Sequence, residues 1–293
     1  METVLKGRKG IVRIAPDLPT VLISKPVNPT RRKRLTDEWT SGNIGIAKNE
    51  ALAHIAAGAD VINVNVGVVG REQVALLPCA VETIQNAVEV PLSIDTPDPE
   101  ALAAALKVYQ GKPLVNSVSG EEKSLSQVLP LVAEHGAAVV GLCVNEDGIP
   151  GNPVKRLEIA RRIIERAEDM GISRENVLIN CMTMPIESDR QAALTTLETI
   201  RLVRAELGVN ITLDTCNISF DLPNCDALSL TFLAMAIATG VNAPIVNVAQ
   251  AKQTIVSLDL LLGRDEFAMR YIRYYHFRRS GVRGLVDWEL VDW

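Results

Sequence analysis

The chain has 293 residues and a hydrophobic content of 47%, which is enough for a sizeable core in one large domain or two small ones. Its formal net charge of −5 argues against a nucleic-acid-binding protein, because such proteins usually carry a strong basic balance. A short basic run at 31–34 is followed by Asp37 and Glu38, and we interpret it as a solvated loop or a local anion contact rather than a nucleic-acid patch.

Cysteine usage and the lack of long apolar runs predict a cytoplasmic protein. The five cysteines form no Cys-x-x-Cys pair and most lie in apolar runs, which is typical of reduced core residues. The N-terminus has no apolar signal region, and no apolar run approaches the roughly 18 residues of a membrane span. We therefore expect no membrane partner and no nucleic-acid partner.

Short apolar runs alternate with longer segments of helical periodicity along the chain. The predicted strands are 21–25, 61–65, 92–95, 114–117, 139–145, 177–181, 211–215 and 244–248. The predicted helices include 50–59, 99–110, 126–136, 156–171, 192–208 and 228–240, where apolar residues recur at three- and four-residue spacing. Several of these helices end on glycine, a common helix C-terminal signal.

Eight strands alternating with helices allow a closed (β/α)₈ TIM barrel or an open doubly wound sheet. No Gly-x-Gly-x-x-Gly follows the first strand, which weakens the dinucleotide-binding form of the open sheet. The count of eight favours the barrel. Because no linker divides the chain, we predict a single domain over 1–293. From about Arg264 onward, where most aromatic residues lie, we expect a final helix and a tail, which is compatible with packing on a partner subunit.

Asparagines recur where the predicted strands end, which is where a barrel of this kind builds its active site. In the segment "VINVNVG" (61–67), Asn63 and Asn65 share one face of the strand and need hydrogen-bond partners there. The equivalent positions of the eight strands hold Asn28, Asn65, Asp95, Asn116, Asn145, Asn180, Asn217 and Asn247. A single such asparagine is typical of a turn or cap, whereas eight in register indicate a polar ring at the barrel mouth.

This ring favours a flat heterocyclic ligand over a metal ion. An amide presents donors and an acceptor without net charge, which suits a heterocycle whose edge alternates donors and acceptors. A divalent metal needs several carboxylates or His and Cys ligands, and the histidines His54, His135 and His276 fall in helical segments. We therefore expect no directly bound metal and no Ser-His-Asp triad.

Five short motifs stand at or near the ends of the predicted strands and in the predicted helix at 228–240: "SIDT" (93–96), "NSVSGE" (116–121), "VNEDGIP" (144–150), "CNIS" (216–219) and "TFLAMAIATG" (231–240). Together they resemble the pterin-binding barrel family, to which dihydropteroate synthase also belongs. Within that family the chain is most similar to the methyltetrahydrofolate:corrinoid-protein methyltransferases, over roughly 21–264. The resemblance implies a barrel that binds tetrahydrofolate or 5-methyltetrahydrofolate, a separate corrinoid protein that carries cobalamin, and a homodimer.

The resemblance also implies roles for single residues. Asp95 and Asn116 resemble pterin-ring contacts, and Asn217 resembles the asparagine near N5, the atom that carries the methyl group. The predicted catalytic residues are therefore Asn217 and Asp95. The predicted pterin-binding residues are Asp95, Asn116, Asn180, Asn217, Asn65, Asn145 and Asn247.

Three departures from the family pattern concern acids. Asn63 and Asn180 stand where the family usually has aspartate, and Lys25 stands where glutamate is common. A carboxylate would make stronger, charge-assisted bonds to a pterin. With few acids at the mouth, the sequence favours transfer from a methylated corrinoid onto tetrahydrofolate, as in the second methyltransferase of a demethylase system.

Two other functions remain open at this point. A dihydropteroate-synthase-like condensation needs clustered cations for a diphosphate, and the segment after the last strand, "NVAQAKQT" (247–254), offers only Lys252. The chain could also be a non-catalytic scaffold that binds a pterin or a corrinoid protein and that lost activity through the acid-to-amide changes.

Overall fold

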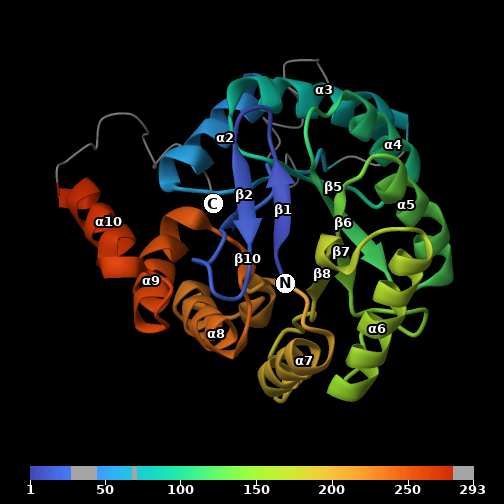
Figure 1. Ribbon diagram of the computed structural model, residues 1–293. Coiled ribbons are helices and arrows are strands. Elements are labelled where there is room, and N and C mark those ends of the chain that lie inside the picture. Colours follow the sequence, from blue (N-terminus) through green and yellow to red (C-terminus); the bar gives the residue numbers. More distant parts are fainter. Residues whose placement is uncertain (28–44, 68–70, 280–293) are drawn as a thin grey trace.

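The computed structural model describes residues 1–27, 45–67 and 71–279. Eight parallel strands are hydrogen-bonded in the order β3-β10-β9-β8-β7-β6-β5-β4. Parallel bridges from Ile23 to Val61 and from Val27 to Val64 join the two outermost strands, β3 and β4, so the sheet closes into a barrel surrounded by helices (Figure 1). The predicted (β/α)₈ barrel is therefore confirmed.

The elements have the following bounds. The strands are β1 (Thr3–Lys6), β2 (Ile11–Ile14), β3 (Ile23–Ser24), β4 (Ile62–Val64), β5 (Leu92–Asp95), β6 (Leu114–Ser119), β7 (Ala138–Leu142), β8 (Val177–Asn180), β9 (Ile211–Asp214) and β10 (Ala243–Val246). The helices are α2 (Gly45–Ala57), α3 (Arg71–Ala87), α4 (Pro99–Val108), α5 (Glu122–Glu134), α6 (Pro153–Asp169), α7 (Ala192–Leu207), α8 (Cys225–Thr239), α9 (Val248–Leu261) and α10 (Met269–Arg279). Short 3₁₀ turns are η1 (Arg174–Asn176), η2 (Cys216–Ser219) and η3 (Glu266–Ala268).

Residues on the two faces of each strand pack in two different layers of the core. Outward-facing residues such as Ile62, Ile94 and Leu213 pack with the helices in one large cluster. Inward-facing residues such as Leu114 and Leu178 form a smaller cluster near the amino-terminal ends of the strands, which we call the lower end of the barrel. This alternation with period two follows from strand geometry, and it assigns every other residue of a strand to the barrel interior.

An antiparallel hairpin of β1 and β2 closes the lower end of the barrel, and the sequence did not predict it. The hairpin lies across the centre of the ring of helices in Figure 1, and its Leu5 and Ile14 are fully buried in the inner cluster. Asn210, just before β9, donates from Nδ2 to Thr3 Oγ1 and to the Ile14 carbonyl, both at 2.8 Å. The lower end of the barrel is therefore sealed by both packing and hydrogen bonds.

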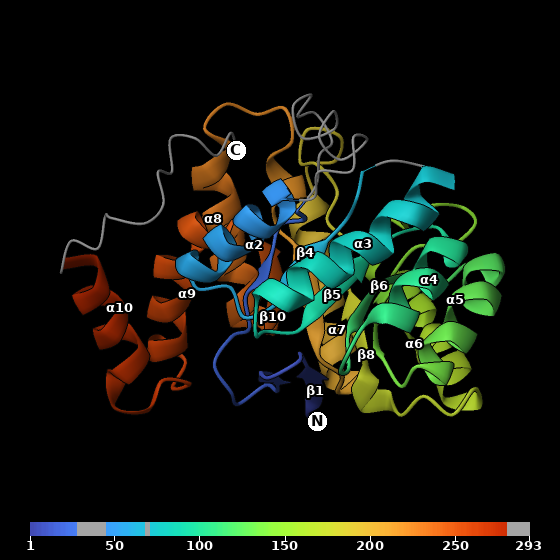
Figure 2. The ribbon, with the colours of Figure 1, turned by 90° about the horizontal axis from the view of Figure 1, so that it is seen from above.

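The predicted final helix is present as α10, which lies beside α9 in Figures 1 and 2. Arg270 Nη1 donates to Oδ2 of Asp259 at 2.9 Å, and this fully buried carboxylate also accepts from the backbone nitrogen of Thr20.

The tail from 280, the basic run at 31–34 and Asn28 lie outside the described residues. Across those described residues, no helix combines the length and the apolar character that crossing a membrane requires.

We expect Ile14→Ala to lower the free energy of unfolding by about 2–5 kcal/mol, because it leaves a cavity in the inner core. The matched control is Ile11→Ala on the same strand, where the side chain is 59% exposed and the change should stay within about 0.5 kcal/mol. Urea unfolding of both variants measures the difference. Equal losses would contradict the burial of the hairpin in the barrel.

Candidate active site

Polar side chains occupy the inward positions of the upper half of the barrel, towards the carboxyl ends of the strands. Their neighbours in sequence, among them Val64, Ile94 and Leu213, belong to the outer core layer, so the strand period places the polar residues inside. The inward set consists of Lys25, Asn63, Asn65, Ser93, Asp95, Asn116, Asn180, Thr212, Asp214 and Asn247. We call this end of the barrel the mouth.

The carboxylate of Asp95 joins the two asparagines of the "VINVNVG" segment. Asn63 Nδ2 donates to Oδ2 of Asp95 and Asn65 Nδ2 donates to Oδ1, each at 3.1 Å. Burial raises the pKa of Asp95, the two amide hydrogen bonds oppose that rise, and the charge of Asp214 adds to it. Asp95 therefore accepts one hydrogen bond from Asn63, within β4, and one from Asn65, directly after β4.

Register places Asn116 next to this group. Asp95 pairs with Asn116 across β5 and β6, and both side chains are half-buried. The structure therefore brings together four of the residues of interest: Asn63, Asn65, Asp95 and Asn116.

Several buried polar atoms of the interior lack a hydrogen-bond partner among the described residues. They are Oδ1 of Asn63, Oγ of Ser93, Oγ1 of Thr183, Oγ1 of Thr212 and Oδ1 of Asn247. All except Thr183 belong to the inward set. An unsatisfied buried polar atom costs about 1–3 kcal/mol, so the interior is suited to a ligand with a hydrogen-bonding edge, such as a pterin.

Asp214 is a second carboxylate in the inward set, and the sequence analysis missed it because it took Asn217, which follows the predicted strand at 211–215, as the mouth residue there. β9 ends at Asp214, whereas Asn217 lies in the η2 turn and is exposed. The signal was present, because "ITLD" of β9 has the same pattern as "LSID" of β5, which ends in Asp95.

The surroundings of Asp214 affect its pKa in opposite directions. Its Oδ1 accepts a hydrogen bond from the backbone nitrogen of Cys216 at 3.0 Å. Burial raises the pKa of Asp214, while the Cys216 N–H bond and the charge of Lys25 lower it. Burial also raises the pKa of the Cys216 thiol, with a further rise from Asp214 and an opposing effect from Lys25. Lys25, Asp214 and Cys216 therefore form one electrostatic group.

Of the remaining predicted residues, Asn180 and Asn247 lie at the mouth and Asn145 lies outside it. Asn180 is buried at the end of β8, and its Oδ1 accepts from the backbone nitrogen of Met182 at 2.9 Å. Asn247 is buried at the start of α9. The predicted strand over 139–145 was too long: β7 ends at Leu142, and Asn145 lies in a turn that bridges to Gly148.

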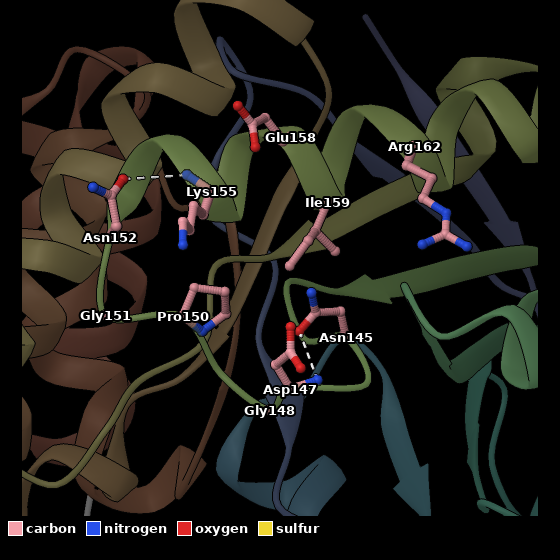
Figure 3. A pocket seen from close by; sticks show the side chains of 10 residues that line it. All are labelled: Asn145, Asp147, Gly148, Pro150, Gly151, Asn152, Lys155, Glu158, Ile159 and Arg162. Carbon is pink, nitrogen blue, oxygen red and sulfur yellow. Dashed lines mark hydrogen bonds between the residues drawn. The ribbon is translucent and has the colours of Figure 1, made fainter.

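Asn145 lines a separate groove of about 630 Å³ between its own loop and α6 (Figure 3). In that groove its Oδ1 accepts from the backbone nitrogen of Asp147 at 3.2 Å, and the other lining residues include Lys155 and Arg162. None of the other predicted pterin contacts lines this groove.

A buried arginine supports the loops at the mouth. Arg156 on α6 is 1% exposed and donates to the carbonyls of Pro150, Cys181 and Met182 at 2.7–3.0 Å. It thereby joins the loops that follow β7 and β8. Sequence reasoning did not find this role, because Arg156 lies within an ordinary helical pattern. Among the described residues, no three His, Cys, Asp or Glu side chains gather in a way that could hold a metal ion.

The chain belongs to the pterin-binding enzyme family, whose model matches residues 27–247. The match spans β4 to β10 and therefore includes every inward polar residue of the mouth except Lys25. This confirms the resemblance that the sequence motifs indicated.

Curated relatives are methyltransferases. The methylcorrinoid:tetrahydrofolate methyltransferase of Eubacterium limosum is 28% identical over 241 residues, which cover 80% of this chain and 88% of the relative. The methionine synthase of Mycobacterium tuberculosis is 28% identical over 274 residues. The alignment covers 86% of this chain but only 23% of that protein, so the chain corresponds to less than a quarter of it.

Solved structures of dihydropteroate synthase share the fold. The enzyme of Xanthomonas albilineans in complex with indole-2-carboxylic acid and 6-chloroguanine aligns with a TM-score of 0.68 and 21% sequence identity. The alignment covers 89% of this chain and 99% of that chain.

We expect the free energy of unfolding of the ligand-free wild-type protein to fall relative to that of Asp214→Asn as the pH rises. The fall should begin at a pH of about 4, the ordinary pKa of an aspartate, and continue until the pH passes the raised pKa of Asp214. In that range the folded protein retains a proton that the unfolded chain releases, so rising pH favours unfolding. Urea unfolding at several pH values measures the difference between the two proteins. Asp221→Asn, a change at an exposed acid after η2, should keep the wild-type pH dependence. A constant difference between wild type and Asp214→Asn would contradict the assignment.

Proposed function

We propose that this protein transfers a methyl group between a corrinoid protein and N5 of tetrahydrofolate, in the direction that forms 5-methyltetrahydrofolate. The observation that carries the proposal is the set of amides and carboxylates inside the mouth of a pterin-binding barrel, centred on Asp95. The relative from Eubacterium limosum, whose name states this reaction and direction, covers most of the chain.

The chemistry requires alignment more than a protein nucleophile. Methyl transfer is a displacement in which the attacking nitrogen, the methyl group and the leaving cobalt must lie in line, and holding reactants in that geometry lowers the barrier. The pterin ring would be held by Asp95, Asn116 and Asn180, whose side chains offer both donors and acceptors. Asn65 and Asn247 would complete the ring of contacts.

Asn217 is suited to the reacting face of the pterin. Its turn, η2, follows β9 at the mouth, and its side chain is exposed there, where a large partner can approach. Its amide can donate or accept a hydrogen bond at N5. Methyl-group exchange with a protein-bound corrinoid requires such an open position, because the cobalt must come within bonding distance of the methyl carbon.

The dihydropteroate-synthase-like alternative has weaker support. Lys252 was its candidate cation, and this side chain donates from Nζ to the carbonyl of Gly58 at 3.0 Å, between α9 and the end of α2. That contact commits the lysine to helix packing. The structural neighbours of that class are below 25% identical and support the fold alone. A non-catalytic scaffold would bind tetrahydrofolate without turnover.

The proposal extends to the partners and the compartment. The methyl donor is a methylated corrinoid protein that docks over the mouth, and the folate is the acceptor. We also propose a cytoplasmic location, a homodimer and no resident metal. The domain assignment over 1–293, with the segment from about 264 as an added helix and tail, belongs to the same proposal.

We expect the wild-type protein to convert tetrahydrofolate to 5-methyltetrahydrofolate when mixed with a methylated corrinoid protein, or with free methylcobalamin at higher concentration. Asn217→Ala and Asp95→Ala should each lower the rate about 10²-fold or more, because the pterin would lose its alignment. The cobalt absorbance spectrum and direct assay of the product measure the transfer.

The matched control is Asn86→Ala. Asn86 is exposed at the end of α3 and accepts a hydrogen bond from Arg8 in the β1–β2 connection, at the opposite end of the barrel. Its rate should equal that of wild type. No methyl transfer by the wild-type protein with its cognate corrinoid protein would contradict the proposal and favour a scaffold.

A further inference from the structure

Methylation of tetrahydrofolate releases a proton, and the mouth must accept it. N5 of tetrahydrofolate is a secondary amine, so after it gains a methyl group it carries both the methyl and its original hydrogen. Neutral 5-methyltetrahydrofolate forms only when that proton leaves. Amide side chains are too weakly basic to take it, so the asparagines of the mouth cannot serve this purpose. The inference below rests on the proposed function.

Two carboxylates belong to the inward set, and their surroundings differ. Both oxygens of Asp95 already accept amide hydrogens, from Asn63 and Asn65. Only one oxygen of Asp214 is engaged, since Oδ1 accepts from the backbone nitrogen of Cys216. Within the described part of the chain, Oδ2 of Asp214 has no hydrogen-bond partner, and the residue retains some solvent exposure. Asp214 therefore has one oxygen, Oδ2, that accepts no hydrogen bond from the described residues, whereas each oxygen of Asp95 already accepts one.

The position of Asp214 also matches this purpose. The bond to the Cys216 nitrogen ties the carboxylate to the η2 turn, and the next residue in that turn is Asn217. If Asn217 lies at N5, then Asp214 lies on the same side of the pterin. Asp95 and Asn116, on β5 and β6, are separated from β9 by β7 and β8 in the ring of strands.

We propose that Asp214 is the catalytic base that accepts the N5 proton through Oδ2, and that Lys25 is a positioning residue that favours this proton transfer. During the reaction the lone pair of N5 forms the new bond to carbon, and the electron pair of the carbon–cobalt bond stays on cobalt. The pair of the N5–H bond then becomes the lone pair of the product, and the proton moves to Asp214. The methylated corrinoid is the co-reactant, and no other oxidant or reductant is needed.

The charges around Asp214 support both roles. Lys25, after β3, lowers the pKa of Asp214 and so favours the ionised carboxylate, while the charge of Asp214 raises the pKa of Asp95 on β5. Cys216 lies in η2 beside it, and Asp226 on α8 acts on that thiol. A lysine charge near N5 also opposes a positive charge on the methylated nitrogen and so favours loss of its proton. This gives a physical reason for a lysine at a position where the family commonly has glutamate.

The test compares wild type, Asp214→Asn and Asp221→Asn with tetrahydrofolate at saturation and methylcobalamin or the methylated corrinoid protein as donor. For wild type, kcat should rise with pH to a plateau as Asp214 loses its proton. For Asp214→Asn, kcat should fall about 10²-fold and lose that pH dependence. The Kd for tetrahydrofolate, measured by calorimetry, should change less than about threefold. Asp221→Asn should behave as wild type.

A second variant guards against a purely structural effect. Asp214→Ala leaves space for a small carboxylate, so added formate should restore part of the lost kcat, while the uncharged formamide, which is of similar size, should not. Circular dichroism checks that both variants fold. Lys25→Met should shift the wild-type pH profile towards higher pH, because it removes the charge that favours ionised Asp214.

The outcomes separate the inference from the proposed function. A wild-type protein that transfers no methyl group overturns both. If wild type is active, the inference is overturned by an unchanged kcat and pH profile in Asp214→Asn. It is equally overturned if the Kd for tetrahydrofolate rises in Asp214→Asn while kcat is retained, since Asp214 would then bind the pterin rather than accept its proton. The inference is supported by a loss in kcat alone, with rescue by formate.

Discussion

The buried carboxylate of Asp95 is the constraint on which the rest of the mouth depends. An ionised carboxylate inside a barrel is costly unless donors surround it, and Asn63 and Asn65 supply two donors at 3.1 Å. This explains why an apolar segment of the barrel carries two asparagines, Asn63 in β4 and Asn65 directly after it. It also explains why an amide at position 63 is favourable here. An aspartate there would place a second buried negative charge against Asp95, and Asp214 already adds one nearby.

The mouth therefore still contains two carboxylates, but one of them, Asp214, lies at a position where the sequence analysis did not expect an acid. Asn63 and Asn180, at positions where the resemblance leads us to expect aspartate, are neutral, while Asp214 places a carboxylate on β9 and Lys25 places a cation near it. One side of the mouth combines Asp95 with amides, which is suited to holding a pterin edge. The other side combines Asp214, Lys25 and Cys216 under the turn that presents Asn217, which is suited to moving a proton. The two ends of the barrel also differ in purpose, since the apolar hairpin seals the lower end and the polar set opens at the mouth.

Much of this arrangement could be predicted from the sequence, because strand period, helix period and glycine signals are local. The glycines at 58, 136, 171, 208 and 240 all have positive φ, as expected for residues that end helices. The hairpin was missed because "TVLK" and "IVRI" are short and lie before the first barrel strand. Asn145 was placed at a strand end because its apolar run continues past Leu142. Asp214 was missed because the recurring asparagines drew attention to Asn217. Arg156 was missed because two of its three carbonyl partners, Cys181 and Met182, lie in the loop after the next strand.

The central claim is that the inward set around Asp95 is the pterin site. A crystal structure of the protein with tetrahydrofolate bound tests this most directly. The account predicts the pterin ring inside the mouth, within hydrogen-bond distance of Asp95 and Asn116, with at least one of Asn63 Oδ1 and Asn247 Oδ1 gaining a partner and N5 facing Asn217 and Asp214. A pterin seated instead in the groove lined by Asn145 and Lys155, or outside the barrel, would contradict it.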